Sequence, residues 1–196
     1  VVRRGMQLGT YKAYECIVRG GHRFLTMRIS EAEVQNNGDK LDRLMCLNQD
    51  TMDRHQRLMG PGTRIVYNSD TISPGTEDKG ADLCGLPVAE LTQSRNRLVQ
   101  NTVAMGAVAF LMGIDFSVLE ESLTLRFQRR GQEMVDENVK VAKAGYDYAV
   151  EHFRPFEQSP PDGGKPLAVW SGNEALAMGG AAAGVKFYAA YPMRDR

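Results

Sequence analysis

The chain has 196 residues and a mass of 21.7 kDa, enough for one domain of roughly 150 residues and a shorter additional segment. Its 24 basic and 24 acidic side chains give a formal net charge of zero. This balance offers no electrostatic argument for binding to nucleic acid or to an anionic membrane, so we expect neither partner. The sequence shows no signal peptide and no apolar run of about 18 residues, which predicts a soluble protein in the reducing cytoplasm.

The first half of the chain is predicted to form short strands separated by turns, at residues 6–12, 22–29, 41–47, 63–67 and 86–91. Asn48 and Asp50 follow the third strand and are suited to cap a helix over residues 51–59. That helix ends at Gly60-Pro61-Gly62, and the strand after it completes a strand–helix–strand unit. Residues 68–85 are polar and rich in glycine and aspartate, which predicts a loop.

The second half is predicted to be mainly helical. A helix that begins near Asn101 includes Gly106 among several small residues, which allows a neighbouring helix to approach closely. The sequence Ser117-x-x-Glu120 predicts a capping box at the start of the next helix. A long helix over residues 132–153 follows, with a predicted buried face of Met134, Val135, Val139, Ala142, Tyr146 and Val150. Prolines and glycines in residues 154–166 predict a linker between two domains.

The turn Arg19-Gly20-Gly21-His22 is the first candidate ligand site. Paired glycines permit a positive φ and close approach of the backbone to a ligand, and Arg19 and His22 are suited to contact an anionic group such as a carboxylate. The alternative is a tight hairpin turn with exposed polar residues. Asn48 has two interpretations as well, because ligands gather at the carboxyl ends of strands in α/β sheets, whereas asparagine is also a common helix cap.

Other motifs for cofactor chemistry are absent from the sequence. There is no G-x-G-x-x-G loop for a nucleotide phosphate. Cys16, Cys46 and Cys84 lie thirty or more positions apart, so they cannot supply the four thiolates of an iron–sulfur cluster, and we expect them to be small buried side chains. His55 and His152 lie on predicted helices with no acid or thiol arranged around them, and we expect both at the surface.

The last segment predicts the beginning of a second α/β unit. Ser171 and Glu174 form an S-x-x-E capping box ahead of a helix rich in alanine and glycine. The capping box accounts for Glu174 more simply than a catalytic role does. Residues 187–191 predict a strand that ends at Pro192. One helix and one strand leave edges unpaired, so we expect the chain to be a fragment of a larger protein.

Four blocks of sequence resemble a known family: IVRGGHRFLTMRIS (17–30), LMCLNQDTMDRH (44–55), QNTVAMGAVAFLMGID (100–115) and SGNEALAMGGAAAGVKFYAAYP (171–192). The first three resemble the gamma domain of the 2-oxoacid:ferredoxin oxidoreductases, and the fourth resembles the start of the thiamine-diphosphate-type domain of their alpha subunit. The resemblance implies an α/β fold. Residues 1–153 then form a Rossmann-like gamma-type domain, truncated before its first strand and glycine-rich loop and helical in its C-terminal half. A linker at 154–166 leads to the first helix and strand of a thiamine-type α/β domain at 167–196.

The resemblance also implies a function. The chain is expected to be a subunit of an enzyme that decarboxylates a 2-oxoacid oxidatively, with 2-oxoglutarate favoured and pyruvate next, and that transfers the acyl group to coenzyme A and electrons to ferredoxin. Thiamine diphosphate, magnesium and an iron–sulfur cluster belong to the intact complex, and a partner beta subunit carries the thiamine diphosphate and the cluster. This chain alone is expected to hold none of these cofactors and to be inactive.

The resemblance suggests two ligand sites. Coenzyme A, or another anion, is expected at Arg19, Gly20, Gly21, His22 and Asn48. Tyr191 and Pro192 match the start of the family's substrate loop, but Arg194 stands where the family has a threonine. The alternative function is a non-catalytic assembly or interaction domain that keeps the gamma-type scaffold, which the missing glycine loop and threonine favour.

Overall fold

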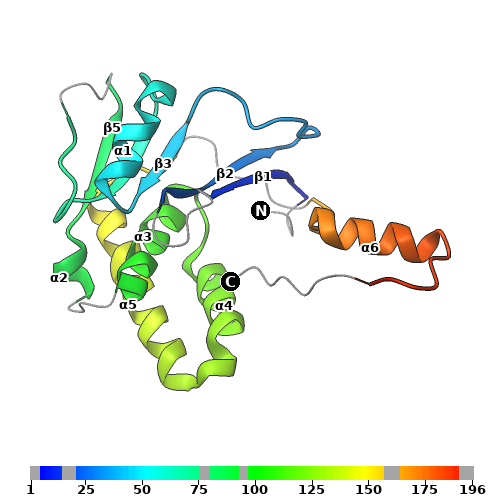
Figure 1. The fold of residues 1–196 in the computed structure, drawn as a ribbon. Coiled ribbons are helices and arrows are strands. Elements are labelled where there is room, and N and C mark those ends of the chain that lie inside the picture. The colour runs from blue at the N-terminus through cyan, green and yellow to red at the C-terminus, as the bar shows by residue number, and fades with distance from the viewer. Residues whose placement is uncertain (1–4, 15–20, 76–79, 93–96, 157–163, 190–196) are drawn as a thin grey trace.

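The computed structural model describes residues 5–14, 21–75, 80–92, 97–156 and 164–189 (Figure 1). Its strands are β1 (Gln7–Tyr14), β2 (Arg23–Ser30), β3 (Arg43–Cys46), β4 (Arg64–Asn68) and β5 (Asp82–Leu86). Its α-helices are α1 (Gln49–His55), α2 (Val88–Thr92), α3 (Arg97–Leu111), α4 (Phe116–Phe127), α5 (Gln132–His152) and α6 (Gly172–Ala182). Short 3-10 turns extend α1 and α4, at Gln56–Leu58 and Gln128–Arg130. The α/β fold class predicted from the sequence is confirmed.

Three parallel strands form the centre of the fold, in the order β3-β4-β5. Strand β3, helix α1 and strand β4 form the predicted strand–helix–strand unit. Neighbouring residues of β4 point to opposite faces of the sheet: Val66 packs in the core beneath α3, and Ile65 packs with Met52 of α1. Helices therefore cover both faces, as parallel sheets require (Figure 1). Strands β1 and β2 form a separate antiparallel hairpin.

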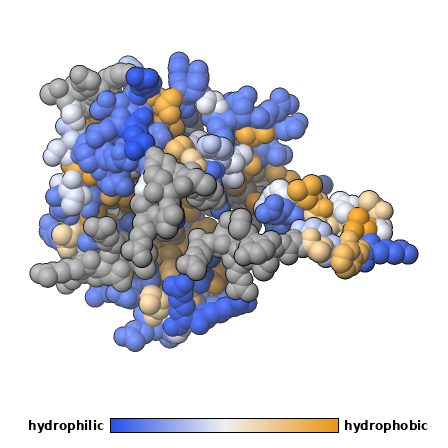
Figure 2. All heavy atoms as spheres, viewed as in Figure 1, coloured by the Kyte–Doolittle hydropathy of each residue, from blue (hydrophilic) through white to orange (hydrophobic). Residues whose placement is uncertain are grey.

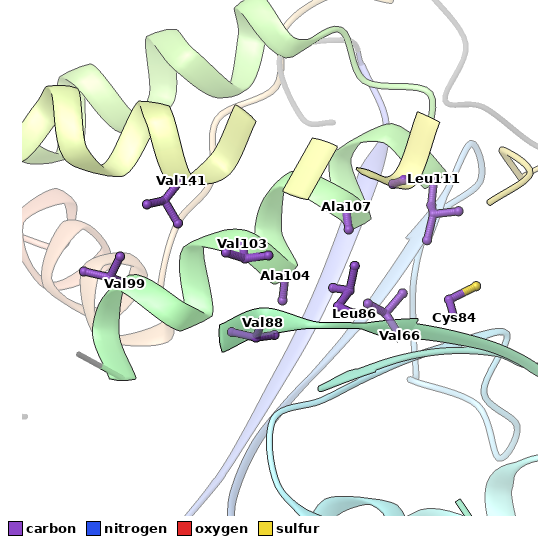
Figure 3. Close-up of a cluster of buried hydrophobic side chains, with 11 residues drawn as sticks. Val66, Cys84, Leu86, Val88, Val99, Val103, Ala104, Ala107, Leu111 and Val141 are labelled. Atoms are coloured by element: carbon purple, nitrogen blue, oxygen red, sulfur yellow. The ribbon is translucent and has the colours of Figure 1, made fainter. Parts of the chain in front are cut away.

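The larger core lies between the parallel sheet and α3. Figure 3 shows side chains of α3 directed toward the strands and α2. The buried residues of this cluster are Val66, Cys84, Leu86, Val88, Val99, Val103, Ala104, Ala107, Leu111, Val141 and Ala149. Cys46 and Cys84 are both free and buried, as predicted, whereas Cys16 lies outside the described residues.

Helices α3 and α5 approach each other closely at two glycines. A Cβ atom placed on Gly106 would lie 1.9 Å from the carbonyl oxygen of Ala142, and one placed on Gly145 would lie 2.1 Å from that of Val103. Beside these contacts, the buried Thr102 hydroxyl of α3 lies 3.0 Å from Asn138 Oδ1 of α5, to which it donates. The predicted close approach at Gly106 is confirmed, and its partner is α5.

The predicted buried face of α5 is partly wrong. Ala142 and Val135 are buried, but Met134 is 36% exposed and Val150 is 50% exposed. The buried face is instead Val135, Asn138, Val141, Ala142, Gly145 and Ala149. The prediction assumed that the most apolar side chains of the helix are buried. The contact with α3 instead requires Gly145 and the hydrogen-bonding amide of Asn138, so the buried face is rotated relative to the predicted one.

Three further predictions of local structure are wrong. Strand β5 lies inside the predicted loop at 68–85, because Leu83 and Cys84 are apolar and pair beside β4. Of the predicted strand at 86–91, Leu86 ends β5, and residues 88–91 belong instead to the short helix α2, which starts after Pro87, a residue suited to a helix start. The predicted Ser117-x-x-Glu120 box is absent: Asp115 is the N-cap of α4 and makes no side-chain capping bond.

The residues after α5 remain packed on the domain. The Phe156 N–H donates to the Leu111 carbonyl oxygen at 2.8 Å, and the Arg43 guanidinium lies 3.8 Å from the centre of the Phe156 ring. Arg64, at the start of β4, pairs with Asp82 at the start of β5 at 2.6 Å. Residues 154–156 therefore cover the amino ends of the parallel strands, on the side opposite their carboxyl ends. The rest of the predicted linker, except residues 164–166, lies outside the described residues, and the division into domains stays a prediction.

Helix α6 projects from the body of the molecule (Figure 1). The predicted capping box is confirmed, since Ser171 and Glu174 cap each other's backbone N–H groups. Residues 187–189 form no strand, which corrects that part of the predicted 187–191 strand, because no strand among the described residues pairs with them. The segment exposes large side chains, including Trp170, Leu176, Met178, Phe187 and Tyr188, and patches of orange mark its hydrophobic residues in Figure 2. No helix in the described part of the chain has the length and apolarity to span a membrane.

The two interhelical glycines generate a prediction. Gly106→Ala and Gly145→Ala each force a methyl group against a backbone carbonyl and should lower the free energy of unfolding by about 1–3 kcal/mol or more. At roughly 2–4 °C per kcal/mol, the Tm should fall by several degrees. Gly179→Ala is the matched control, because a Cβ on this α6 glycine would meet nothing within 4 Å.

Thermal unfolding followed by circular dichroism at 222 nm compares the three variants. The control should leave the Tm unchanged or raise it, since alanine favours a helix over glycine by about 1 kcal/mol. Equal Tm values for Gly106→Ala, Gly145→Ala and the unmodified chain would contradict the close approach of α3 and α5.

Candidate functional site

A pocket of ≈ 490 Å³ opens at the carboxyl ends of the parallel strands. Cys46, Asn68 and Leu86 are the last residues of β3, β4 and β5, and all three line it. Its complete lining is Cys46, Leu47, Asn48, Gln49, Tyr67, Asn68, Thr71, Leu86, Val88, Gln100, Asn101 and Ala104. Helix α3 thus forms the wall opposite the strand ends. Open α/β sheets bind ligands at this edge, which makes the pocket the candidate functional site.

The pocket is uncharged and only partly polar. None of the lining residues is acidic or basic, and six carry an amide or an aliphatic hydroxyl group: Asn48, Gln49, Asn68, Thr71, Gln100 and Asn101. Apolar side chains such as Leu86 and Ala104 fill the remaining wall. Such a lining suits a neutral ligand group that both stacks on apolar surface and forms hydrogen bonds. A phosphate group would need positive charge, which these residues do not supply.

Two of the amides are oriented by local hydrogen bonds. Asn48 Oδ1 accepts from the Thr51 N–H at 2.9 Å and from the Thr51 hydroxyl at 2.8 Å, so Asn48 caps α1 as predicted. Asn68 Oδ1 accepts from the Asp70 N–H at 3.0 Å. Because these bonds use the carbonyl oxygens, the amide nitrogens are the groups that can donate to a ligand. Asn48 is therefore both a helix cap and a pocket residue.

The cysteine in the pocket is unsuited to be a nucleophile. Cys46 is 1% exposed, and burial, with a smaller contribution from Asp53, raises the pKa of its thiol to about 12. Cys84, in the core beneath α3, has its pKa raised to about 11 by burial, followed by the charge of Asp82. Both thiols stay protonated at neutral pH and act as apolar packing groups.

The predicted Arg19-Gly20-Gly21-His22 turn lies only partly within the described residues, because Arg19 and Gly20 fall outside them. Gly21 has a φ of +86°, a conformation that favours glycine. His22 is buried, and its Nδ1 lies 3.1 Å from Asp50 Oδ2. Asp50 follows Gln49, which lines the pocket, so His22 and the pocket both lie beside the N-terminal part of α1. A ligand role of the turn stays a prediction.

Two histidine predictions have different outcomes. The surface position predicted for His55 is wrong: it is 9% exposed and packs against the ring of Phe24, with centroids 4.8 Å apart. His55 is buried by a tertiary contact, because the β1–β2 hairpin covers the C-terminal end of α1. The surface position of His152 is confirmed, and its ring stacks on Tyr148.

The remaining candidates of the second unit lie away from the pocket or outside the described residues. Glu174 Oε2 accepts from the Ser171 N–H at 2.7 Å, and hydrogen bonds from the Ser171 backbone and side chain lower the pKa of Glu174. Tyr191 and Pro192 lie outside the described residues. Within the described part of the chain, no group of three or more His, Cys, Asp or Glu side chains is arranged to hold a metal ion. These residues therefore do not fit magnesium or an iron–sulfur cluster.

Several pocket residues were not predicted from the sequence. Asn68 directly follows the predicted strand at 63–67, as Asn48 follows the predicted strand at 41–47. The rule that ligands gather at the carboxyl ends of strands would therefore have identified Asn68 too. Gln100 and Asn101 carry no such signal, because their place in the wall depends on how α3 crosses the sheet.

The thiol pKa values generate a second prediction. In native protein at pH 8, Cys46 and Cys84 should resist alkylation by iodoacetamide, because burial keeps both thiols protonated and covered. In guanidinium chloride both should react at the rate of an ordinary cysteine. Peptide mass spectrometry resolves the two sites from Cys16. Rapid native alkylation of Cys46 would contradict both its burial and its inert role in the pocket.

Comparisons with known proteins agree with this fold. The 2-oxoacid:ferredoxin oxidoreductase 2 alpha subunit of Aeropyrum pernix is 21% identical over 98% of this chain, which spans 37% of that protein. The structure of 2-oxoglutarate:ferredoxin oxidoreductase from Magnetococcus marinus, with 2-oxoglutarate, coenzyme A and succinyl-CoA bound, has a TM-score of 0.84 and 23% identity. The similarity covers 93% of this chain and 33% of that chain.

A second solved structure matches the body of the fold. It is the gamma subunit of keto/oxoacid ferredoxin oxidoreductase from Geobacter sulfurreducens, with a TM-score of 0.56 and 21% identity over 75% of this chain and 82% of that chain. The sequence model of the family described as "Pyruvate ferredoxin/flavodoxin oxidoreductase" matches residues 1–148, most of the chain. The resemblance predicted from the four sequence blocks is confirmed: this chain belongs to the pyruvate ferredoxin/flavodoxin oxidoreductase family.

Proposed function

We propose that this chain is the coenzyme A-binding part of a 2-oxoacid:ferredoxin oxidoreductase subunit. The enzyme decarboxylates a 2-oxoacid oxidatively and transfers the acyl group to coenzyme A, with 2-oxoglutarate favoured as substrate and pyruvate next. The observation that carries the proposal is the uncharged, amide-lined pocket at the carboxyl edge of the sheet, within the residues that the family model matches. The solved Magnetococcus relative, which contains 2-oxoglutarate and coenzyme A, supports the choice of substrate.

The chemistry of coenzyme A fits this part of the molecule. Its adenine base and the two amides of its pantetheine arm are neutral and form hydrogen bonds, whereas its phosphates are anionic. We place a neutral part of coenzyme A in the pocket, with donors from the Asn48 and Asn68 amide nitrogens. We assign the phosphates to the Arg19-Gly20-Gly21 turn that the sequence predicts as an anion site, because Arg19 carries the positive charge that the pocket lining lacks.

The remaining chemistry belongs to other parts of the complex. Thiamine diphosphate with magnesium supplies the decarboxylation, and an iron–sulfur cluster passes electrons to ferredoxin. We assign the thiamine diphosphate and the cluster to a partner beta subunit. The role of this chain is to bind coenzyme A and orient its thiol toward the acyl group. The apolar surface of residues 167–189 then packs against the rest of a thiamine-type domain, in a cytoplasmic enzyme.

Calorimetric titration with coenzyme A tests the proposal. Asn101 is exposed in the α3 wall of the pocket. We assign one further hydrogen bond to coenzyme A to the Asn101 amide. Asn101→Ala removes this bond, worth about 0.5–1.5 kcal/mol, and should weaken binding roughly two- to tenfold. Asn101→Asp adds a negative charge beside an anionic ligand and should weaken it further. Asn173→Asp makes the same change on α6, away from the pocket, and should leave the Kd unchanged.

The turn is tested in the same titrations. Arg19→Ala should weaken binding and reduce its dependence on salt, because one phosphate contact is lost. Pantetheine, which lacks the nucleotide, should be insensitive to Arg19→Ala. No binding of coenzyme A to the unmodified chain, or equal Kd values for Asn101→Asp and Asn173→Asp, would contradict the assignment of the pocket.

A further inference from the structure

The β1–β2 hairpin depends on a small group of side chains for its position. It is a two-stranded sheet of its own, and an isolated two-stranded hairpin is marginally stable in water. Its outer face is open, with Leu25 49% and Met27 55% exposed. At the start of β2, however, His22 and Phe24 reach α1. These contacts connect the hairpin to the body of the fold.

Four side chains form this connection, which we call the histidine clasp: His22, Phe24, Asp50 and His55. His22 Nε2 lies 3.2 Å from His55 Nε2, and both rings are buried. The other nitrogen of His22, Nδ1, lies 3.1 Å from Asp50 Oδ2. The Phe24 ring meets His55 edge-on, with an interplanar angle of 77°, and lies 5.3 Å from His22 between centroids.

The contact between the two Nε2 atoms requires one shared proton. A protonated ring nitrogen donates and cannot accept, so one histidine must present N–H and the other a bare nitrogen. With His22 Nδ1–H donating to Asp50, His22 Nε2 either accepts from a neutral His55 or, when His22 is charged, donates to it. Both arrangements keep at most one positive charge in the pair. A second positive charge would set two N–H groups against each other at 3.2 Å.

The charged groups around His55 in the described part of the chain favour its neutral form. Burial lowers the pKa of His55, and the positive charges of His22 and Arg54 lower it further, whereas Asp50 opposes them more weakly. The carboxylate of Asp50 is itself held by Arg54, whose Nε lies 2.7 Å from Oδ1. Arg54 and Asp50 belong to α1, and His22 precedes β2.

We propose that the histidine clasp is a pH-sensitive latch, in which protonation of both histidines releases the β1–β2 hairpin from α1. The direction of the pH effect on docking follows from the difference in the His55 pKa between the two states. The pKa of His55 is lower in the docked state than in the released state, so docking is fully favoured above the ordinary histidine pKa of about 6.5 and weakens as the pH falls below it. Each pKa unit between the two states changes the docking equilibrium by about tenfold. The proposal does not depend on coenzyme A or on any partner.

The chain contains three histidines, so their imidazole signals can be followed individually. The exposed His152 is an internal reference for the pair in the clasp. Proton–carbon NMR of the imidazole groups, titrated from pH 8 to pH 5, should show His55 titrating below the ordinary histidine pKa of about 6.5. Hydrogen exchange across the same range, corrected for the intrinsic rate, should show protection of β1 and β2 falling about tenfold or more, while the α3–α5 helices keep theirs.

Two variants separate the latch from general acid instability. His55→Gln keeps a neutral side chain that forms hydrogen bonds, so hairpin protection should no longer depend on pH between 8 and 5. His152→Gln should behave as the unmodified chain. The proposal is overturned if hairpin protection in the unmodified chain stays constant to pH 5 while both clasp histidines become protonated. It is also overturned if His55→Gln folds and loses hairpin protection with the same pH dependence.

Discussion

The contact between α3 and α5 is the constraint on which the rest of the domain depends. Gly106 and Gly145 let each helix lie against a carbonyl group of the other, and the buried Thr102–Asn138 hydrogen bond beside them fixes the register. With α3 held in this way, its other face presents Ala104 and Ala107 to the parallel sheet (Figure 3). The position of α3 then defines one wall of the pocket at the carboxyl ends of the strands.

Two features of the fold place the polar side chains around the pocket. Parallel strands bring Asn48 and Asn68 to one edge, because Asn68 ends β4 and Asn48 lies two residues after the end of β3. Helix α3 brings Gln100 and Asn101 to the same space from the opposite side. The amino ends of the strands are closed differently, by the charged pair Arg64–Asp82 and the ring of Phe156. The lining of the carboxyl edge is therefore uncharged, whereas an ion pair and an aromatic ring close the amino edge.

The sequence predicted those parts of the fold whose signals are local. The Asn48 cap, the strand–helix–strand unit and the Ser171–Glu174 box each depend on a few neighbouring residues, and all are confirmed. The predictions are wrong where contacts between distant segments determine which side chains are buried. The buried face of α5 includes Asn138 because its partner is across the helix interface, and His55 is buried because a distant hairpin covers it. Likewise, no local pattern at Asn101 indicates which side of α3 faces the strand ends.

The most direct test of the account is oxoacid-dependent reduction of ferredoxin, followed optically. The protein that contains this chain should be assembled with a thiamine-binding beta subunit and supplied with 2-oxoglutarate or pyruvate. The account predicts reduction that requires coenzyme A in the assembled enzyme, and none from the 196-residue chain alone. A correctly assembled enzyme that binds coenzyme A and ferredoxin but oxidises no 2-oxoacid would contradict it, as would turnover by the isolated chain.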